Sequence, residues 1–328
     1  MKAQRITDTI SHHGEGPCWW PATGRLRFVD MLAGSVIELD EGGGRGYRRL
    51  PVPSPVASVI RPRAGGGAIV ATERGLALGR AEDLSDLKEV VRLYDDLSMR
   101  TNEGGCDPDG RFWIGTMSYR RTVGAASVYR WDGPGTRPVR AWGGATTANG
   151  LGFSPDGALG YWTDTPTRTV TVFDYDARAG LVNPRPFVEI EEWAGKPDGL
   201  CVDAEGGVWV ALHRGSAVRR YDAQGRLSEV VELPVNKVTA CTFGGEDLDR
   251  LYITTSRENL PDDVEPASGS VYLAEVGVKG LEPLAFAGWG PVPRVSSAGF
   301  AGCFRRFRGA GGRGGRRRSR RAPGPARG

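Results

Sequence analysis

Short strand-like runs, each introduced by a tight-turn sequence, recur along the chain at intervals of 42 to 49 residues. The turns contain Pro, Asp and Gly, which suit a tight reversal, and the runs are rich in Val, Ile, Phe, Tyr and Trp, which favour strands. The pattern predicts six copies of one strand-rich unit. Each turn and its run are 21–24 with 25–29, 62–66 with 68–71, 107–110 with 111–117, 154–157 with 158–163, 203–206 with 207–212, and 245–249 with 250–254.

Another strand-like run follows downstream of most of these units. Helical periodicity is nearly absent, and the best candidate, 81–94, reads equally as a loop followed by a strand. A four-stranded unit of about 40–50 residues is one propeller blade, and six blades form a closed ring without exposed edges. We therefore predict an all-β, six-bladed β-propeller, with two unrelated β-sandwiches as the competing architecture. The downstream runs are 36–40, 128–132, 170–174, 218–222 and 271–273.

Polar residues recur at one phase of this repeat, in the strand that precedes the turn and is expected to line the central channel. Counting back eight or nine residues from the turn glycine gives Glu15, Asn102, Asn149 and Asp198, each followed by Gly within two residues. The spacing predicts that these four side chains converge at one end of the channel. The glycines would let the backbone come close to a ligand. The alternative is that they are ordinary Asn/Asp-Gly turn pairs.

The oxygen ligands of Glu15, Asn149 and Asp198 favour one divalent cation such as Ca²⁺, Mg²⁺ or Mn²⁺, whereas Zn²⁺ usually takes His or Cys. Three protein ligands leave coordination positions for water and substrate. Neither a GxSxG nor an HExxH motif is present, and the GxGxxG match at 309–314 follows no strand. Two of the three histidines, His12 and His13, precede Glu15 and lie either beside the site or in a surface loop.

Charge changes the picture at the C-terminus. The net charge is +4, but residues 290–328 contain 11 Arg and no Asp, Glu or Lys, so the rest has 32 basic and 39 acidic groups. We divide the chain into a propeller, 1–289, and a Gly/Arg-rich tail, 290–328, expected to be disordered or to arise from an altered reading frame. If the tail replaces a closing strand, the last blade is compromised. An RGG-like nucleic-acid-binding segment is the alternative, although an acidic body makes nucleic acid an unexpected partner.

The remaining composition points to a monomeric cytoplasmic protein without a membrane partner. No apolar run approaches the roughly 20 residues that span a bilayer, and no secretory signal is visible at the N-terminus. The five cysteines form no CxxC pair, which indicates reduced, mostly buried thiols. Four tryptophans near the turns are expected to pack the blades rather than to form a substrate cage. They are Trp19, Trp113, Trp162 and Trp209.

On these residues the chain resembles the SMP-30/gluconolactonase/luciferin-regenerating enzyme family, from about residue 12 to 288. The resemblance implies a six-bladed propeller, with Glu15, Asn149 and Asp198 as metal ligands and with Arg100 and Asn102 binding substrate hydroxyls. It also implies divalent-metal-dependent hydrolysis of a sugar lactone to the aldonic acid, which is a carboxylic-ester hydrolase activity of the gluconolactonase class. In this reaction Asp198 is expected to take the proton of the attacking water. The matching motifs are 13–17, 28–30, 99–102, 107–117, 149–157, 163–165, 196–200, 243–245 and 251–254.

The chain departs from the family pattern at two places. The usual Asn-Asp-Gly is Asn102-Glu103-Gly104 here, which is expected to move the channel floor. Some relatives carry a substrate-contacting acid after the segment that ends at Met117, where this chain has 118–120, Ser-Tyr-Arg. The substrate preference therefore does not carry over. The alternative function is a non-enzymatic cation-binding or scaffold propeller, because a fold alone does not assign function.

Overall fold

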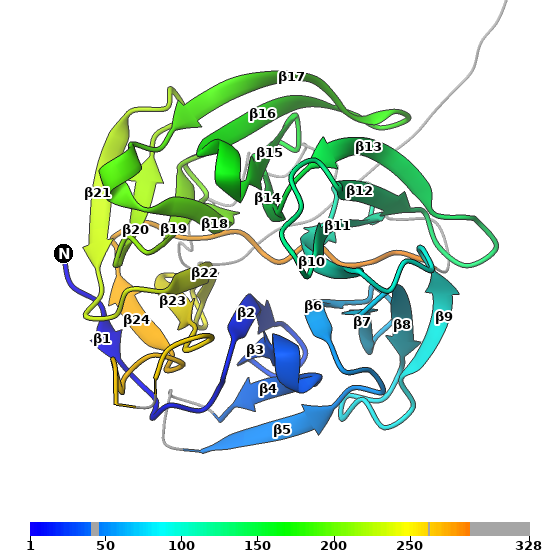
Figure 1. The fold of residues 1–328 in the computed structure, drawn as a ribbon, viewed down its shortest axis with the longest axis horizontal. Helices are drawn as coiled ribbons and strands as arrows, with labels where there is room; N and C mark the ends of the chain where they lie inside the picture. Colours follow the sequence, from blue (N-terminus) through cyan, green and yellow to red (C-terminus); the bar gives the residue numbers. More distant parts are fainter. Residues whose placement is uncertain (41–45, 262, 289–328) are drawn as a thin grey trace, which may run out of the picture. The chain divides into compact units, whose positions relative to one another are not determined.

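Six four-stranded antiparallel sheets surround a central channel in the structure, a computed structural model that describes residues 1–40, 46–261 and 263–288. Figure 1 shows the sheets arranged radially as the blades of a propeller. The predicted all-β six-bladed fold is confirmed. In the described part of the chain the helical turns are short 3₁₀ helices, η1 (Met31–Ala33), η3 (Thr165–Thr167) and η4 (Glu192–Ala194).

Each blade is a meander whose first-named strand lies at the channel and whose last-named strand lies at the outer edge. Blade 1 contains β2 (Gly14–Trp20), β3 (Arg25–Asp30), β4 (Ser35–Leu39) and β5 (Tyr47–Pro51). Blade 2 contains β6 (Ala57–Pro62), β7 (Ala68–Thr72), β8 (Gly75–Gly79) and β9 (Lys88–Arg92). Blade 3 contains β10 (Met99–Cys106), β11 (Phe112–Ser118), β12 (Ala126–Trp131) and β13 (Val139–Ala145).

The second half of the ring follows the same plan. Blade 4 contains β14 (Ala148–Phe153), β15 (Leu159–Asp164), β16 (Thr169–Asp176) and β17 (Gly180–Glu189). Blade 5 contains β18 (Lys196–Val202), β19 (Val208–His213), β20 (Ala217–Tyr221) and β21 (Leu227–Glu232). Blade 6 contains β22 (Val238–Gly244), β23 (Arg250–Thr255), β24 (Tyr272–Glu275) and β1 (Gln4–Arg5).

The repeat found in the sequence corresponds to the second strand of every blade, and the strand before each turn is the innermost one, as predicted. The ambiguous segment 81–94 is a loop followed by β9. The last blade is closed from the N-terminus, since β1 pairs with β24 through Gln4 with Leu273 and Arg5 with Tyr272 (Figure 1). The described residues therefore complete blade 6 without a strand from the tail, and the prediction for 290–328 lies outside them.

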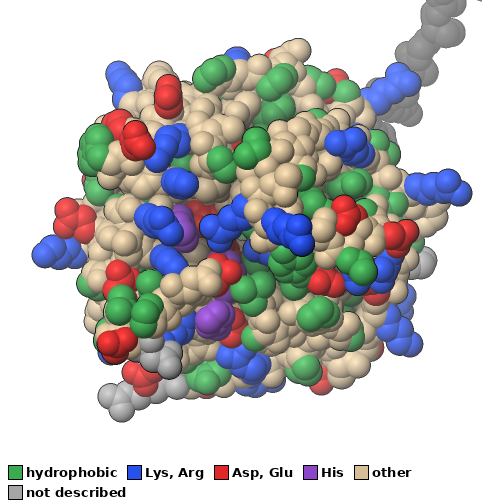
Figure 2. Space-filling view, viewed as in Figure 1, with side chains coloured by type: hydrophobic (Ala, Val, Ile, Leu, Met, Phe, Trp, Pro, Cys, Tyr) green, Lys and Arg blue, Asp and Glu red, His purple; other side chains and the backbone are tan. Residues whose placement is uncertain are grey.

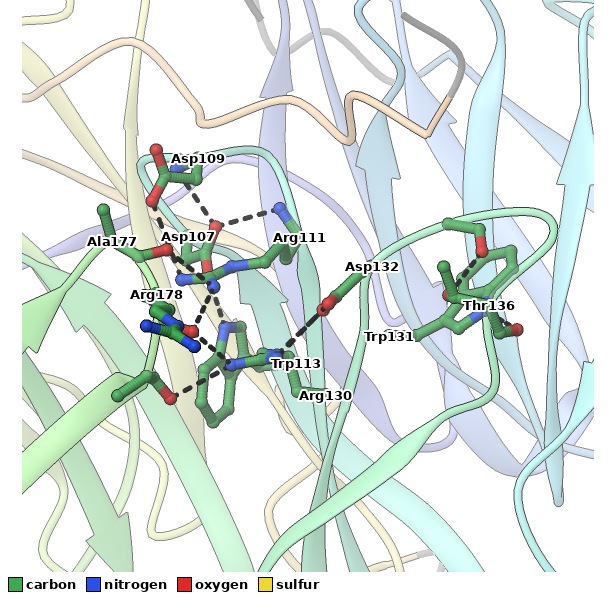
Figure 3. A network of polar contacts seen from close by, with 12 residues as sticks. Asp107, Asp109, Arg111, Trp113, Arg130, Trp131, Asp132, Thr136, Ala177 and Arg178 are labelled. Carbon is green, nitrogen blue, oxygen red and sulfur yellow. Dashed lines mark hydrogen bonds and ion pairs between the residues drawn. The ribbon is translucent and has the colours of Figure 1, made fainter. Parts of the chain in front are cut away.

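A buried aspartate in the turn after the innermost strand forms hydrogen bonds with its own turn and with the next strands of its blade; Figure 3 shows the example in blade 3. In blade 3, Asp107 Oδ2 accepts hydrogen bonds from Trp113 Nε1 at 2.8 Å and Arg111 Nε at 2.7 Å. In blade 5, Asp203 Oδ2 accepts from Trp209 Nε1 at 2.8 Å and from an arginine of β20. Trp113 and Trp209 are buried, so these two tryptophans pack the blades, as predicted.

The chain after β24 crosses the ring and contacts distant blades, shown in orange in Figure 1. Lys279 accepts a backbone hydrogen bond from Ala204 of blade 5, and Phe286 donates one to Pro62 of blade 2. The Phe286 ring stacks on Trp131 of blade 3 at a centroid distance of 5.2 Å. This segment lines a second cavity that also contains the Glu103 side chain and is distinct from the cavity described below.

The described cysteines are free thiols, and most of them are buried, as predicted. No helix in the described ranges is long and apolar enough to cross a membrane. The free cysteines are Cys18, Cys106, Cys201 and Cys241.

Candidate active site

The inner strands of four blades bring the predicted polar residues into one cavity of about 340 Å³. Glu15 comes from β2, Asn102 from β10, Asn149 from β14 and Asp198 from β18, and Arg100 of β10 lines the same cavity. All five side chains belong to buried residues. The predicted convergence is therefore observed, and the turn-pair alternative is wrong because the side chains point into a shared cavity rather than into separate loops.

Each of these inner strands is irregular at the position of its polar residue. The pairing register shifts between Glu15 and Cys18, 101 and 104, 148 and 151, and 197 and 200. A bulge redirects the side chain beside it, which explains how these four side chains can all face the channel. A Cβ on Gly150 would lie 2.8 Å from the Asp198 carbonyl oxygen. The glycine therefore permits close approach of the neighbouring inner strand, whereas the predicted close approach of a ligand stays a prediction.

A chain of hydrogen bonds orients the two amides. Arg100 Nη1 donates to Asn102 Oδ1 at 2.7 Å, and Asn102 Nδ2 donates to Asn149 Oδ1 at 3.3 Å and to the Ala148 carbonyl at 2.9 Å. Asn149 Nδ2 donates to Thr165 Oγ1 at 2.7 Å. With its NH₂ group bonded to Thr165 of η3, Asn149 directs its oxygen toward Asn102 within the same cavity, and an amide oxygen is a suitable ligand for a divalent cation.

Three carboxyl groups, those of Glu15, Glu103 and Asp198, are buried together at the channel. Burial and the charges of Asp198 and Glu103 raise the pKa of Glu15 well above its usual value. Burial and Glu103 likewise raise the pKa of Asp198, against a hydrogen bond from Asn149 and the charge of Arg100. Within the described residues none of the three forms an ion pair with Lys or Arg. Mutually repelling buried carboxylates with an amide oxygen beside them fit a divalent cation, which would supply the missing charge.

His13 belongs to the wall of this cavity rather than to a surface loop. Its Nδ1 lies 2.7 Å from Ser256 Oγ, and its Nε2 lies 3.7 Å from Glu15 Oε1. Burial and the charge of Arg100 lower the pKa of His13 well below 6.5, so the imidazole is neutral at pH 7. A neutral His13 contributes no charge to compensate Glu15. The neighbouring His12 is exposed.

Sequence reasoning missed the residues at the mouth of the cavity. These residues end or follow the second strand of a blade or begin the inner one, and antiparallel pairing brings these positions to the same end of the channel. Extending the phase argument to the position just after each second strand would have found most of them. They are Arg121, Thr165, Lys196, His213, Arg214 and Glu258.

Replacing Glu103 with glutamine is expected to stabilise the metal-free protein more at pH 8 than at pH 5. Burial raises the pKa of Glu103 to about 7, and its Oε2 atom has no hydrogen-bond partner among the described residues. The folded state binds the Glu103 proton more tightly than the unfolded state does. The contribution of this group to the free energy of unfolding is therefore fully present below pH 4.5 and is lost as pH rises through about 7. Glutamine removes that loss, a gain of about 1–3 kcal/mol at pH 8.

Urea denaturation in EDTA at the two pH values measures this gain, with the exposed Glu246→Gln as the control. An equal gain at pH 5 and pH 8 would contradict a raised pKa for Glu103.

The fold and the site together define a six-bladed propeller with a buried, acid-lined cavity at one end of its channel. The chain belongs to the SMP-30/Gluconolactonase/LRE-like family, whose region matches residues 13–257. It is 34% identical to Xenopus laevis regucalcin over 301 residues, covering 88% of this chain and 99% of that protein. It is also 34% identical over 295 residues to the Bacillus subtilis "Putative sugar lactone lactonase YvrE", with coverage of 88% and 99%.

A solved structure shows the same architecture. The crystal structure of the calcium-binding protein regucalcin from Agrobacterium tumefaciens superimposes with a TM-score of 0.80 at 30% identity, covering 87% of this chain and 97% of that one. The all-β ring is therefore the fold of this family.

Proposed function

We propose that this protein hydrolyses a sugar lactone to its aldonic acid with one divalent cation held by Glu15, Asn149 and Asp198. The observation that carries the proposal is the group of buried carboxylates without a Lys or Arg ion pair in the described residues, placed beside an oriented amide oxygen in an open cavity. Membership in a family with gluconolactonases supports the reaction class. A bound cation would polarise the ester carbonyl as a Lewis acid.

The chain's own residues supply the remaining chemistry. Asp198 takes a proton from the attacking water as the water oxygen bonds to the carbonyl carbon. The ring C–O bond then breaks as Asp198 returns this proton to the ring oxygen, which leaves as a hydroxyl, and the new carboxylic acid ionises. The products are the carboxylate of the aldonic acid and one released proton. Arg100, buried and lining the cavity, donates forked hydrogen bonds to sugar hydroxyls, and Asn102 fixes its orientation. The cavity volume suits one monosaccharide.

A lactone panel in a pH-indicator assay tests the proposal. We expect turnover of at least one sugar lactone in Ca²⁺, Mn²⁺, Mg²⁺ or Zn²⁺, loss of that turnover in EDTA, and recovery when the metal is returned. Cation binding is followed separately as a rise in melting temperature, since a ligand that binds only the folded state stabilises it.

The second candidate function is a cation-binding or scaffold propeller without catalysis. The open mouth of the cavity and the position of Arg100 beside the carboxylates favour the enzyme. A metal-dependent rise in melting temperature with no turnover of any lactone would establish the second function and exclude the first.

A further inference from the structure

Basic residues from two blades surround the mouth of the cavity. Arg121 follows β11 in blade 3, whereas Lys196 begins β18 and Arg214 follows β19 in blade 5. Deeper in the cavity Arg100 is buried, while Arg121 is exposed at the rim. Figure 2 shows this face: Lys and Arg side chains gather around a central hollow that contains histidine side chains. The cavity is therefore acidic and amide-lined at its base and basic at its rim.

These rim cations have little compensation from the protein. Arg121 Nη2 lies 3.9 Å from Glu258 Oε2, and the Arg121 side chain is 60% exposed. Among the described residues, the side chains of Lys196 and Arg214 form no hydrogen bond or ion pair. Glu258 is thus the one acid among the cavity residues that faces the rim cations, because Glu15 and Asp198 lie at the base.

The positive charge of the rim acts on the neighbouring His213 side chain. The pKa of His213, which lines the same cavity, is lowered to about 4 by burial and then by Lys237, Arg214, Arg121 and Lys196. Four cations on different segments act on one imidazole in the same direction. Arg121, Lys196 and Arg214 line the same cavity, so their charges act together at its mouth.

We propose that the substrate is a lactone that carries an anionic group, a phosphate or a carboxylate, at the end of the sugar away from the ester. This inference rests on the proposed function. A divalent cation at the base would compensate Glu15 and Asp198, leaving Glu258 as the one acid of the described cavity lining that opposes its basic residues. An anion at the rim would relieve the repulsion among them, and arginine side chains bind phosphate and carboxylate by paired hydrogen bonds.

Three lactones that differ in charge test the inference with the metal-loaded full chain. They are neutral glucono-δ-lactone, its 6-phosphate, and glucaro-1,4-lactone, whose terminal carboxylate is free. We expect kcat/KM for at least one anionic lactone to exceed that for the neutral lactone by about 10-fold or more at low salt, and the ratio to shrink as ionic strength screens the rim. The two anionic substrates separate phosphate from carboxylate recognition.

Charge reversal at the rim provides the matched test. Arg121→Glu and Arg214→Glu are expected to lower the anionic-to-neutral ratio of kcat/KM about 10-fold or more, mainly through KM. Arg137→Glu, an arginine outside the cavity, is expected to leave the ratio unchanged. Melting temperatures check that both rim variants fold.

The possible failures are distinguishable. Hydrolysis of glucono-δ-lactone at least as fast as both anionic lactones, or an unchanged ratio in both rim variants, would overturn anionic recognition and leave the lactonase proposal standing. Absence of turnover for every lactone with metal bound would overturn the lactonase proposal, and the inference with it.

Discussion

Metal-dependent lactone turnover is expected to fall at least about 100-fold when Asp198 is replaced by asparagine. The asparagine side chain would keep one oxygen for the cation and the neighbouring contact with Asn149, but it cannot accept the proton of the attacking water. Asp198→Ala removes the oxygen as well. Rates in the pH-indicator assay, with metal content measured on the same samples, separate the two roles.

Measuring the variants at saturating metal separates metal binding by Asp198 from proton transfer by Asp198. If Asp198 only binds the cation, added metal restores the rate of Asp198→Asn, whereas a residue that also accepts the proton leaves the rate low at full metal content. Asp222→Asn, in a turn of blade 5 far from the cavity lining, is the control and should match the unaltered protein. Turnover by Asp198→Ala at the unaltered rate with full metal content would show that the proposed mechanism is wrong.

The ring and the four polar positions could be predicted from the sequence because both depend on period. A turn sequence every 42 to 49 residues defines the blades, and an offset of eight or nine residues before the turn glycine locates the polar position of the inner strand in four of them. Period alone therefore locates Glu15, Asn102, Asn149 and Asp198 together. Their roles as ligands, base and substrate contacts remain predictions, because they depend on groups that bind to the protein.

Features that depend on contacts between distant segments could not be predicted from period. The closing strand β1 has two residues, too few for a pattern, and its partner β24 lies more than 260 residues away in the chain. The buried His13 forms its hydrogen bond with Ser256 of blade 6, at a sequence separation of 243. The basic rim combines two loop residues, Arg121 and Arg214, with the first residue of β18, Lys196, and these come from two separate blades.

Asp203→Ala is expected to lower the free energy of unfolding by about 3 kcal/mol. The Asp203 side chain is fully buried and accepts hydrogen bonds from Trp209 Nε1 at 2.8 Å, Arg220 Nε at 2.7 Å and two backbone N–H groups of its turn. Alanine leaves these donors without their acceptor, and among the described residues the Arg220 charge then keeps the exposed Glu205, at 3.0 Å, as its acidic partner. Urea denaturation measures the loss as a lower midpoint.

Asp222→Ala is the matched control, because the same type of turn and arginine bonds occurs there near solvent, without the bond from a tryptophan. Asp222 accepts from two backbone N–H groups of its turn and from Arg226 Nε at 2.7 Å, but the Arg226 side chain is 75% exposed. Water can replace the lost acceptor, so we expect a loss below about 1 kcal/mol. Asp107→Ala in blade 3 should resemble Asp203→Ala, since Asp107 makes the corresponding bonds. Equal losses at Asp203 and Asp222 would mean that turn geometry, and not the buried tryptophan and arginine contacts, accounts for the stability of the blade.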